Sequence, residues 1–415
     1  MGRCNRVLIL SLLALPVILL AGCLPGTGSS PGVSSAPESI SAEVESSPTV
    51  ASGNKEQETG SQAEEMLRQM TLREKVGQLF IIRPDALDFT LSQETIDDPN
   101  TPGVTAVSDE MKSAIREYPA GGLVLFGKNL VSPQQITAFN KELQKCSGAP
   151  LFLCVDEEGG AVARLANHPA FDLPQYESAA AVGKSGDPED ARRMGSTIGA
   201  YLYDYGFNVD FAPDADVNTN PDNPVIGTRA FSSDAQTAAA LARGMADGLR
   251  QQGILPVFKH FPGHGDTLED SHAGIAVTHK TREQLETCEF LPFEQASRQE
   301  AIMVGHIAVP ELTGDLTPAT MSERMVTEVL KNQLGFEGLI VTDSLSMGAI
   351  TDAYSPADAA LTALAAGCDL LLMPNDYRQA FDAVLAAAED GILLESQLDD
   401  IVLRILQCKE DLGLL

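Results

Sequence analysis

The sequence predicts an α/β protein whose folded part is a single (β/α)8 barrel of the TIM type. Short apolar runs recur eight times along the chain, and most of them are continuous rather than alternating. Continuous runs are typical of parallel strands that are buried on both faces. Segments with helical periodicity separate most of these runs. Eight strands that alternate with helices predict a parallel barrel with an outer ring of helices.

The elements can be assigned in order along the chain. Apolar residues paired at positions i and i+4 predict an opening helix over residues 63–77. The eight expected strands are residues 78–82, 122–126, 151–155, 207–211, 256–260, 301–307, 338–342 and 369–373. The expected helices are residues 134–145, 189–203, 235–252, 282–299, 322–334 and 356–366, with a closing helix over residues 398–412. No internal repeat and no second domain after the eighth unit are predicted.

The N-terminal segment is expected to be a leader and a tether. Two arginines precede an apolar stretch over residues 7–20 that is too short for a stable membrane span, so residues 1–22 are predicted to be a signal peptide. The letters LAGC, ending at Cys23, resemble the lipobox of bacterial lipoproteins, whose cysteine is diacylated; ordinary signal cleavage beside an incidental cysteine is the alternative. Residues 23–60 are then a lipidated cysteine and a flexible linker rich in Ser, Gly, Pro and Glu. The barrel is expected over residues 61–415.

This organisation predicts an exported protein, anchored by lipid on Cys23 to the extracytoplasmic face of the cell membrane. The formal net charge of −30 argues against nucleic acid as a partner and against electrostatic docking on anionic lipid. The cysteines beyond Cys4 and Cys23 are scattered without a CxxC motif, which argues against a disulfide framework and a metal knuckle. No cofactor is expected, and we expect a monomer.

Residues 259–272, KHFPGHGDTLEDSH, contain the densest group of candidate functional residues. Lys259 and His260 end an apolar strand, where ionisable groups are costly unless they bind or react with something. A proline and two glycines then break the strand and start a loop that carries Asp270 and His272. Further ionisable residues end other expected strands: Asp156, Asp214, His306 and Asp343. Active sites of this fold lie at the C-terminal ends of the strands, so these residues predict an active site there.

Several motifs occur in order along residues 61–415. They are MTLREKVGQLF at residues 70–80, VDEEGG at residues 155–160, NPVIGTRAF at residues 223–231, KHFPGHGDTLEDSH at residues 259–272 and IVTDSLSM at residues 340–347. Together they resemble family 3 glycoside hydrolases, in the bacterial β-N-acetylhexosaminidase branch. The resemblance implies an exo-acting, retaining β-N-acetylglucosaminidase. Its substrates would be cell-wall or chitin-type oligosaccharides, hydrolysed through a covalent glycosyl–Asp intermediate.

The resemblance also implies roles for individual residues. Asp343 would be the nucleophile, His272 the acid/base and Asp270 the residue that orients His272. The substrate-binding residues would be Asp156, Arg164, Arg229, Lys259, His260 and His306. These residue types suit the reaction, because a carboxylate is ionised at neutral pH and an imidazole titrates near about 6.5. Glu157 and Ala161 depart from the Gln and Arg of many relatives, which would alter the pocket wall.

Several residues have simpler interpretations. His264 is expected to pack or to bond the loop backbone, and Asp266 to accept backbone amides in a turn. Asp214 is expected to bond backbone amides or a neighbouring Arg. His264, Asp266, Asp270 and His272 have the chemistry of zinc ligands, but their spacing is not that of a helical HExxH site, so no metal is predicted.

Three other functions are compatible with the residues. Phosphorolysis of the same glycosides is one, since a neutral His does not repel an incoming phosphate. β-Glucosidase activity is the second. The third is a non-catalytic sugar-binding lipoprotein, although such a protein would not need Asp343, Asp270 and His272 together.

Overall fold

The strands form one parallel barrel, as the sequence predicts. The computed structural model of the chain describes residues 60–268 and 274–415. The sheet has the order β11-β9-β7-β6-β3-β2-β1-β12, and every neighbouring pair is parallel. Its strands are β1 (Phe80–Ile82), β2 (Gly122–Val124), β3 (Phe152–Val155), β6 (Val209–Asp210), β7 (Leu255–Phe261), β9 (Ala301–Val304), β11 (Leu339–Thr342) and β12 (Leu371–Leu372).

Hydrogen bonds between β11 and the start of β12 close the barrel. The Ile340 carbonyl accepts from the amides of Asp369 and Leu370 at 2.8 and 3.0 Å. The Thr342 amide donates to the Leu370 carbonyl at 3.0 Å. Each of the eight expected strands therefore corresponds to one strand of a closed barrel, and the predicted fold class is confirmed.

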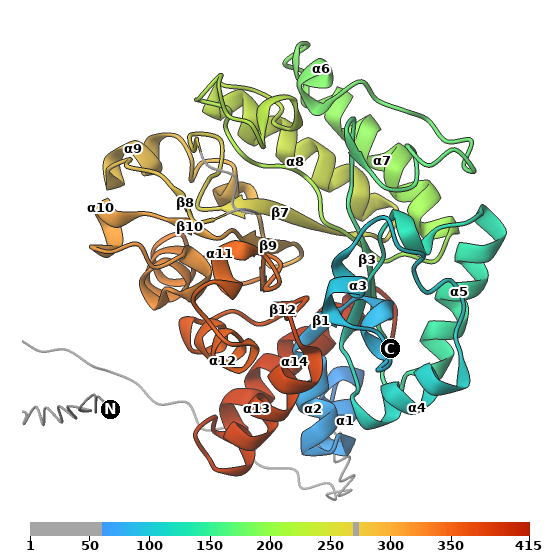
Figure 1. Ribbon diagram of the computed structural model, residues 1–415. Helices are drawn as coiled ribbons and strands as arrows, with labels where there is room; N and C mark the ends of the chain where they lie inside the picture. Colours follow the sequence, from blue (N-terminus) through green and yellow to red (C-terminus); the bar gives the residue numbers. More distant parts are fainter. Residues whose placement is uncertain (1–59, 269–273) are drawn as a thin grey trace, which may run out of the picture. The chain divides into compact units, whose positions relative to one another are not determined.

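Helices surround the barrel (Figure 1). They are α1 (Gln62–Gln69), α2 (Leu72–Gln78), α3 (Gln93–Asp97), α4 (Asp109–Glu117), α5 (Pro133–Cys146), α6 (Ala179–Gly183), α7 (Pro188–Asp204), α8 (Ala235–Gln251), α9 (Arg282–Thr287), α10 (Pro310–Thr313), a π-helix (Arg324–Gln333), α11 (Gly348–Thr351), α12 (Pro356–Ala366), α13 (Tyr377–Glu389) and α14 (Glu395–Asp411). Two small sheets lie outside the barrel. They are the antiparallel pair β4 (Glu157–Gly159) and β5 (Val162–Ala163), and the parallel pair β8 (Ala276–Val277) and β10 (Ile307–Ala308).

Two helices differ from the prediction. The opening segment forms α1 and α2 rather than one helix, because Thr71 starts a new helix through a capping box with Glu74. The segment expected as a helix over residues 282–299 ends at Thr287 and continues as a short 3-10 turn, Phe293–Gln295. Cys288, with φ −138° and ψ −81°, leaves the helical conformation directly after Thr287. The alanine-rich helix α13 was not predicted.

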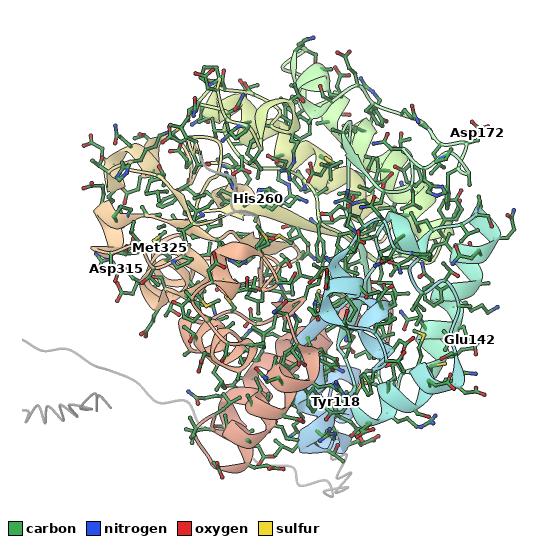
Figure 2. All side chains as sticks on the ribbon, in the orientation of Figure 1. Tyr118, Glu142, Asp172, His260, Asp315 and Met325 are labelled. Carbon is green, nitrogen blue, oxygen red and sulfur yellow. The ribbon has the colours of Figure 1, made fainter. Side chains whose placement is uncertain are left out.

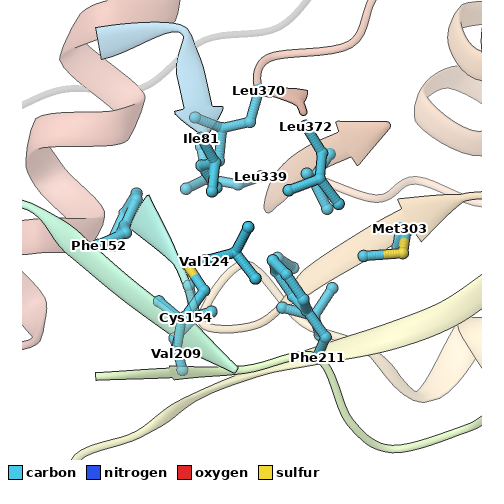
Figure 3. Packing of buried hydrophobic residues seen from close by; sticks show 14 of the residues in the cluster. Ile81, Val124, Phe152, Cys154, Val209, Phe211, Met303, Leu339, Leu370 and Leu372 are labelled. Atoms are coloured by element: carbon cyan, nitrogen blue, oxygen red, sulfur yellow. The ribbon is translucent and has the colours of Figure 1, made fainter. Parts of the chain in front are cut away.

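Apolar side chains fill the barrel, and a cavity lies at one end of it while a buried lysine lies at the other. Val124, Phe211, Met303 and Leu372 belong to this core and also form the floor of a cavity at the C-terminal ends of the strands (Figure 3). The opposite end is closed by the buried Lys409 of α14.

The Lys409 ammonium lies among the segments that precede three strands. It donates to the Gln78 side chain at 2.7 Å and to the carbonyls of Gly121 and Pro150 at 2.8 and 2.6 Å. It also lies 4.7 Å from the centre of the Phe152 ring. These contacts tie together the N-terminal ends of three strands, at the end of the barrel opposite the cavity.

The predicted signal peptide, Cys23 and all of the linker except Gly60 lie outside the described residues. Among the helices of residues 60–268 and 274–415, none is both long and apolar enough to cross a membrane.

Candidate active site

The cavity lies where the sequence predicts the site, at the C-terminal ends of the barrel strands. Its volume is about 390 Å³. His260, from β7, lies near the centre of the view in Figure 2. The residues of the prediction that line the cavity are Asp156, Arg164, Arg229, Lys259, His260 and Asp343, together with His264.

A buried ion-pair network forms one wall of the cavity. The Lys259 ammonium lies 2.8 Å from Asp156 and 2.6 Å from Glu158, and only 3% of its side chain is exposed. Arg229 donates from Nε and Nη2 to the two carboxylate oxygens of Glu158 at 2.9 and 2.8 Å. Arg164 lies 3.4 Å from Asp156. Two carboxylates and three cations therefore share one surface.

The charges of this network stabilise one another. Burial lowers the pKa of Lys259, but the carboxylates of Asp156 and Glu158 outweigh it and hold that pKa above its usual value. Burial alone would raise the pKa of Glu158, but Lys259 and Arg229 lower it to about 2. Asp156 shows the same balance, with its pKa lowered by Lys259 and Arg164 against burial. All of these groups are charged at neutral pH.

The Asp216 carboxylate orients His260. Its Nδ1 lies 2.8 Å from the carboxylate of Asp216, and its Nε2 lies 3.4 Å from Arg229. Burial opposes ionisation of Asp216, but the nearby His260 lowers the pKa of that carboxyl. Burial and Asp216 together raise the pKa of Asp214 well above its usual value. Asp214 accepts from the Asp216 amide and lies 3.5 Å from Arg229, as its simpler interpretation predicted.

These three residues also have the spacing of a metal site. Ligand atoms of Asp214, Asp216 and His260 all lie within 4.8 Å of one another. The Arg229 guanidinium, 3.5 Å from Asp214, opposes a cation at this position. Asp216 therefore supports the His260 ring by a hydrogen bond, and Asp214 accepts from the Asp216 amide.

Asp343 follows β11 and faces the same cavity. The Asp343 amide donates to the Val304 carbonyl of β9 at 2.8 Å, which continues the pairing of the two strands. Its Oδ1 accepts from the Ser344 amide at 2.7 Å. The carboxylate is therefore oriented by the turn that directly follows the strand.

The loop after β7 packs against the NPVIGTRAF segment. The Asn223 side chain donates to the carbonyls of His264 and Thr267 at 2.7 and 3.0 Å. A side chain at Gly265 would place its first carbon 1.9 Å from the Val217 carbonyl, so only glycine fits at this contact. Asn223 and Gly265 together fix the start of the loop that carries Asp270 and His272.

His264 packs within this loop, as expected, whereas the partners of Asp266 differ from those expected. His264 is buried, its Nδ1 lies 2.6 Å from the Thr267 hydroxyl, and burial lowers its pKa. Within the described residues, Asp266 contacts side chains rather than backbone amides. Its carboxylate accepts from the hydroxyls of Thr219 and Thr278 at 3.3 and 3.2 Å and lies 3.5 Å from Lys280. Asp270 and His272 lie outside the described residues.

His306 is placed apart from the other candidates. It is fully buried and is not among the residues that line the cavity. Its ring contacts the Ser344 carbonyl and the Thr320 hydroxyl.

The sequence prediction omitted several residues that line or support the cavity. Glu158 and Asp216 are buried carboxylates of the networks above, and both stand near predicted residues in the acidic runs VDEEGG and PDAD. Arg83 and Asp97 pair at 2.8 Å on the rim, and the Arg83 guanidinium lies over the Phe126 ring. Arg83 could have been predicted from the sequence, because it directly follows β1 and so lies at the C-terminal end of a barrel strand.

The fold and this cavity define a (β/α)8-barrel protein with a polar site at the end of the barrel that holds active sites in this fold. The family model of the glycosyl hydrolase family 3 N terminal domain matches residues 71–408. The chain belongs to glycosyl hydrolase family 3, which confirms the resemblance seen in the motifs.

Individual relatives agree with this family. The beta-hexosaminidase A of Pseudoalteromonas piscicida is 35% identical over 337 residues, which cover 74% of this chain and 56% of the relative. A glycoside hydrolase family 3 beta-N-acetylglucosaminidase from Paenibacillus sp. has a TM-score of 0.75 at 34% identity, covering 83% of this chain and 63% of that chain. The beta-N-acetylhexosaminidase from Beutenbergia cavernae has a TM-score of 0.70 at 28% identity, and the match covers 82% of this chain and 99% of that chain. The chain thus spans less than two thirds of the first two relatives.

Proposed function

We propose that the chain is an exo-acting, retaining β-N-acetylglucosaminidase. The observation that carries the proposal is the cavity of about 390 Å³. Asp343 lines this cavity together with Lys259, Asp156 and Arg164. This volume is near the lower limit of ligand pockets, roughly 300–1,000 Å³, which suits one terminal sugar rather than a long chain. Relatives named beta-hexosaminidase and beta-N-acetylglucosaminidase support the acetamido sugar as the substrate.

In this proposal Asp343 attacks the anomeric carbon. In its ionised form, the carboxylate at the end of β11 needs no separate base to become a nucleophile. Attack forms a glycosyl ester on Asp343 and releases the aglycone, and water then hydrolyses the ester with retention of configuration. The Ser344 amide, 2.7 Å from Oδ1, holds the carboxylate in one orientation during both steps.

His272 is proposed as the acid/base, with Asp270 as its partner. The residue must protonate the leaving oxygen in the first step and deprotonate water in the second, which suits an imidazole. An Asp beside it would fix the tautomer and favour the protonated ring, as in the Asp–His half of a serine-protease triad.

The ion-pair network is proposed to bind the sugar hydroxyls. Lys259, Asp156 and Arg164 are held by one another, so each presents its polar atoms in a fixed direction before the sugar arrives. Hydrogen bonds to charged groups contribute about 1.5–3 kcal/mol each. His260 and Arg229, fixed by Asp216 and Glu158, would complete this binding surface.

The natural substrates are proposed to be cell-wall or chitin-type oligosaccharides with terminal β-linked N-acetylglucosamine. The support for this part is the expectation, from the sequence of residues 1–23, of export and lipid anchoring on Cys23, which would bring the barrel to extracytoplasmic glycans. Mass spectrometry of the N-terminal peptide from membranes tests this part, since a diacylglyceryl group on Cys23 is expected and an unmodified, cleaved N-terminus would contradict it.

A chromogenic assay tests the activity. We expect release of nitrophenol from 4-nitrophenyl N-acetyl-β-D-glucosaminide, far slower release from the glucoside, and loss of activity in Asp343→Asn. Preference for the glucoside would reassign the chain as a β-glucosidase. Formation of N-acetylglucosamine 1-phosphate in phosphate buffer would reassign the reaction as phosphorolysis. Sugar binding without turnover of either glycoside would favour a non-catalytic binding protein.

A further inference from the structure

His306 joins the turn after β11, which lines the cavity, to the segment that contains Thr320. It stands between β9 and β10, is fully buried and is not among the residues that line the cavity. Its Nε2 lies 2.8 Å from the Ser344 carbonyl, and its Nδ1 lies 2.6 Å from the Thr320 hydroxyl. Ser344 is the residue directly after Asp343.

The proton on the ring can be assigned from these partners. A carbonyl oxygen only accepts hydrogen bonds, so Nε2 carries a hydrogen and donates it to Ser344. The Thr320 hydroxyl contacts Nδ1 and also lies 3.1 Å from the Gly305 carbonyl. The plane of the His306 ring is therefore fixed on both sides, by Ser344 and by Thr320.

The backbone of Ser344 in turn fixes Asp343. The Asp343 amide is tied to Val304 of β9 at 2.8 Å, and the Leu345 amide is tied to the Leu372 carbonyl of β12 at 2.9 Å. Between these two ties, the Ser344 amide donates to Oδ1 of Asp343, and the Ser344 carbonyl is held by His306. The Ser344 carbonyl belongs to the Ser344–Leu345 peptide, whereas the Ser344 amide belongs to the Asp343–Ser344 peptide, so His306 acts on this amide through the backbone torsion angles of Ser344.

We propose that His306 is a positioning residue that fixes the Ser344 carbonyl, and through the backbone of Ser344 the Asp343 carboxylate, and that it does not contact the sugar. This inference rests on the proposed function, because it takes Asp343 as the nucleophile. Loss of the Nε2 donor lowers kcat, since a carboxylate displaced from its line of attack reacts slowly even when the sugar is bound. The Michaelis constant changes little, because the residues proposed to bind the sugar do not touch His306.

Two isosteric amides separate the contacts of the two ring nitrogens. His306→Gln retains an N–H close to the position of Nε2, whereas His306→Asn retains one close to the position of Nδ1. We expect kcat for 4-nitrophenyl N-acetyl-β-D-glucosaminide to fall about 100-fold in His306→Asn and less than about tenfold in His306→Gln. KM is expected to stay within about threefold of wild type in both.

Thr320→Val is the matched control, because it removes the hydroxyl that contacts Nδ1 and the Gly305 carbonyl but leaves the contact of Nε2 with Ser344, and it is expected to keep kcat within about tenfold of wild type. Thermal unfolding of all variants accompanies the kinetics, since a purely structural role would make loss of activity follow loss of stability. Equal kcat values for the Gln and Asn variants, or a loss confined to KM, would overturn the inference. If wild type hydrolyses only the glucoside, the kinetics of the variants are compared with the glucoside as the substrate. If wild type turns over neither glycoside, both this inference and the proposed function are overturned.

Discussion

Glu158 offers a quantitative test of the ion-pair network. It is 2% exposed, it accepts two hydrogen bonds from Arg229, and it lies 2.6 Å from Lys259. Glu158→Gln keeps the shape and the hydrogen-bonding oxygen but removes the negative charge. Lys259 then has Asp156 as its remaining anionic partner, and Arg229 has Asp214 at 3.5 Å. We therefore expect a loss of stability that depends on pH.

The size of this loss follows from the pKa of Glu158. That pKa falls from the usual 4.5 to about 2 in the folded protein, which corresponds to about 3 kcal/mol because each pKa unit is worth about 1.4 kcal/mol. A depressed carboxyl pKa stabilises the folded state fully at pH values above about 4.5 and loses this contribution as the pH falls toward 2. Wild type should therefore exceed Glu158→Gln in unfolding free energy by about 3 kcal/mol at pH 7 and by about 1 kcal/mol at pH 3.

Urea unfolding at pH 7, 5, 4 and 3 measures this difference. Glu110→Gln serves as the control, because Glu110 is exposed and belongs to none of the ion pairs of the cavity. The unfolding free energies of wild type and Glu158→Gln are expected to approach each other as the pH falls from 5 to 3. The difference between wild type and the Glu110→Gln control is expected to stay the same at every pH. A difference that is the same at pH 7 and pH 3 would refute the account of Glu158 as an ionised, buried partner of Lys259 and Arg229.

Two further substitutions test other parts of the structure. Asp216→Asn removes the anionic partner of the His260 ring, 2.8 Å away, and is expected to lower kcat/KM about 10–100-fold; an unchanged kcat/KM would show that the ring does not need this support. Lys409→Met removes three hydrogen bonds at the closed end of the barrel and is expected to lower the unfolding free energy by about 2–4 kcal/mol without changing kcat at 25 °C. A loss of kcat in folded Lys409→Met would contradict the separation of the two barrel ends.

The strands and the position of the site could be predicted because both depend on local sequence. A run such as residues 151–155 is apolar on both faces, and burial of both faces is what a parallel barrel requires. Asp156 and Lys259 were found because an ionisable residue that follows such a run must lie at the rim of the barrel. The breaks in the helices were readable in principle, since Thr71 with Glu74 is a capping box and Pro292 argues against one continuous helix over residues 282–299.

The partners within the site could not be predicted in the same way. VDEEGG contains three consecutive acidic residues, and only the β4–β5 pair decides where each one points. Glu157 turns away from the cavity and accepts from the amides of Leu165 and Ala166, at 2.8 Å each, while Glu158 turns toward Lys259. The choice depends on contacts distant in sequence, which no local pattern records.

His306 illustrates the same limit of local sequence. Its place at the end of an apolar strand predicted a residue of the site, and the structure places it one layer behind Asp343, at the Ser344 carbonyl. The distinction depends on the course of the turn after β11 relative to β9, which is a tertiary feature.

The most direct test of the central proposal is to identify the residue that becomes covalently bound to the sugar. A slow fluorinated N-acetylglucosaminide with a good leaving group would be mixed with the protein, quenched with acid, digested and analysed by mass spectrometry. The account predicts one added glycosyl group on the peptide that contains Asp343, absent in Asp343→Asn. A glycosyl group on another residue, or turnover of the reagent with inversion and no adduct, would contradict it.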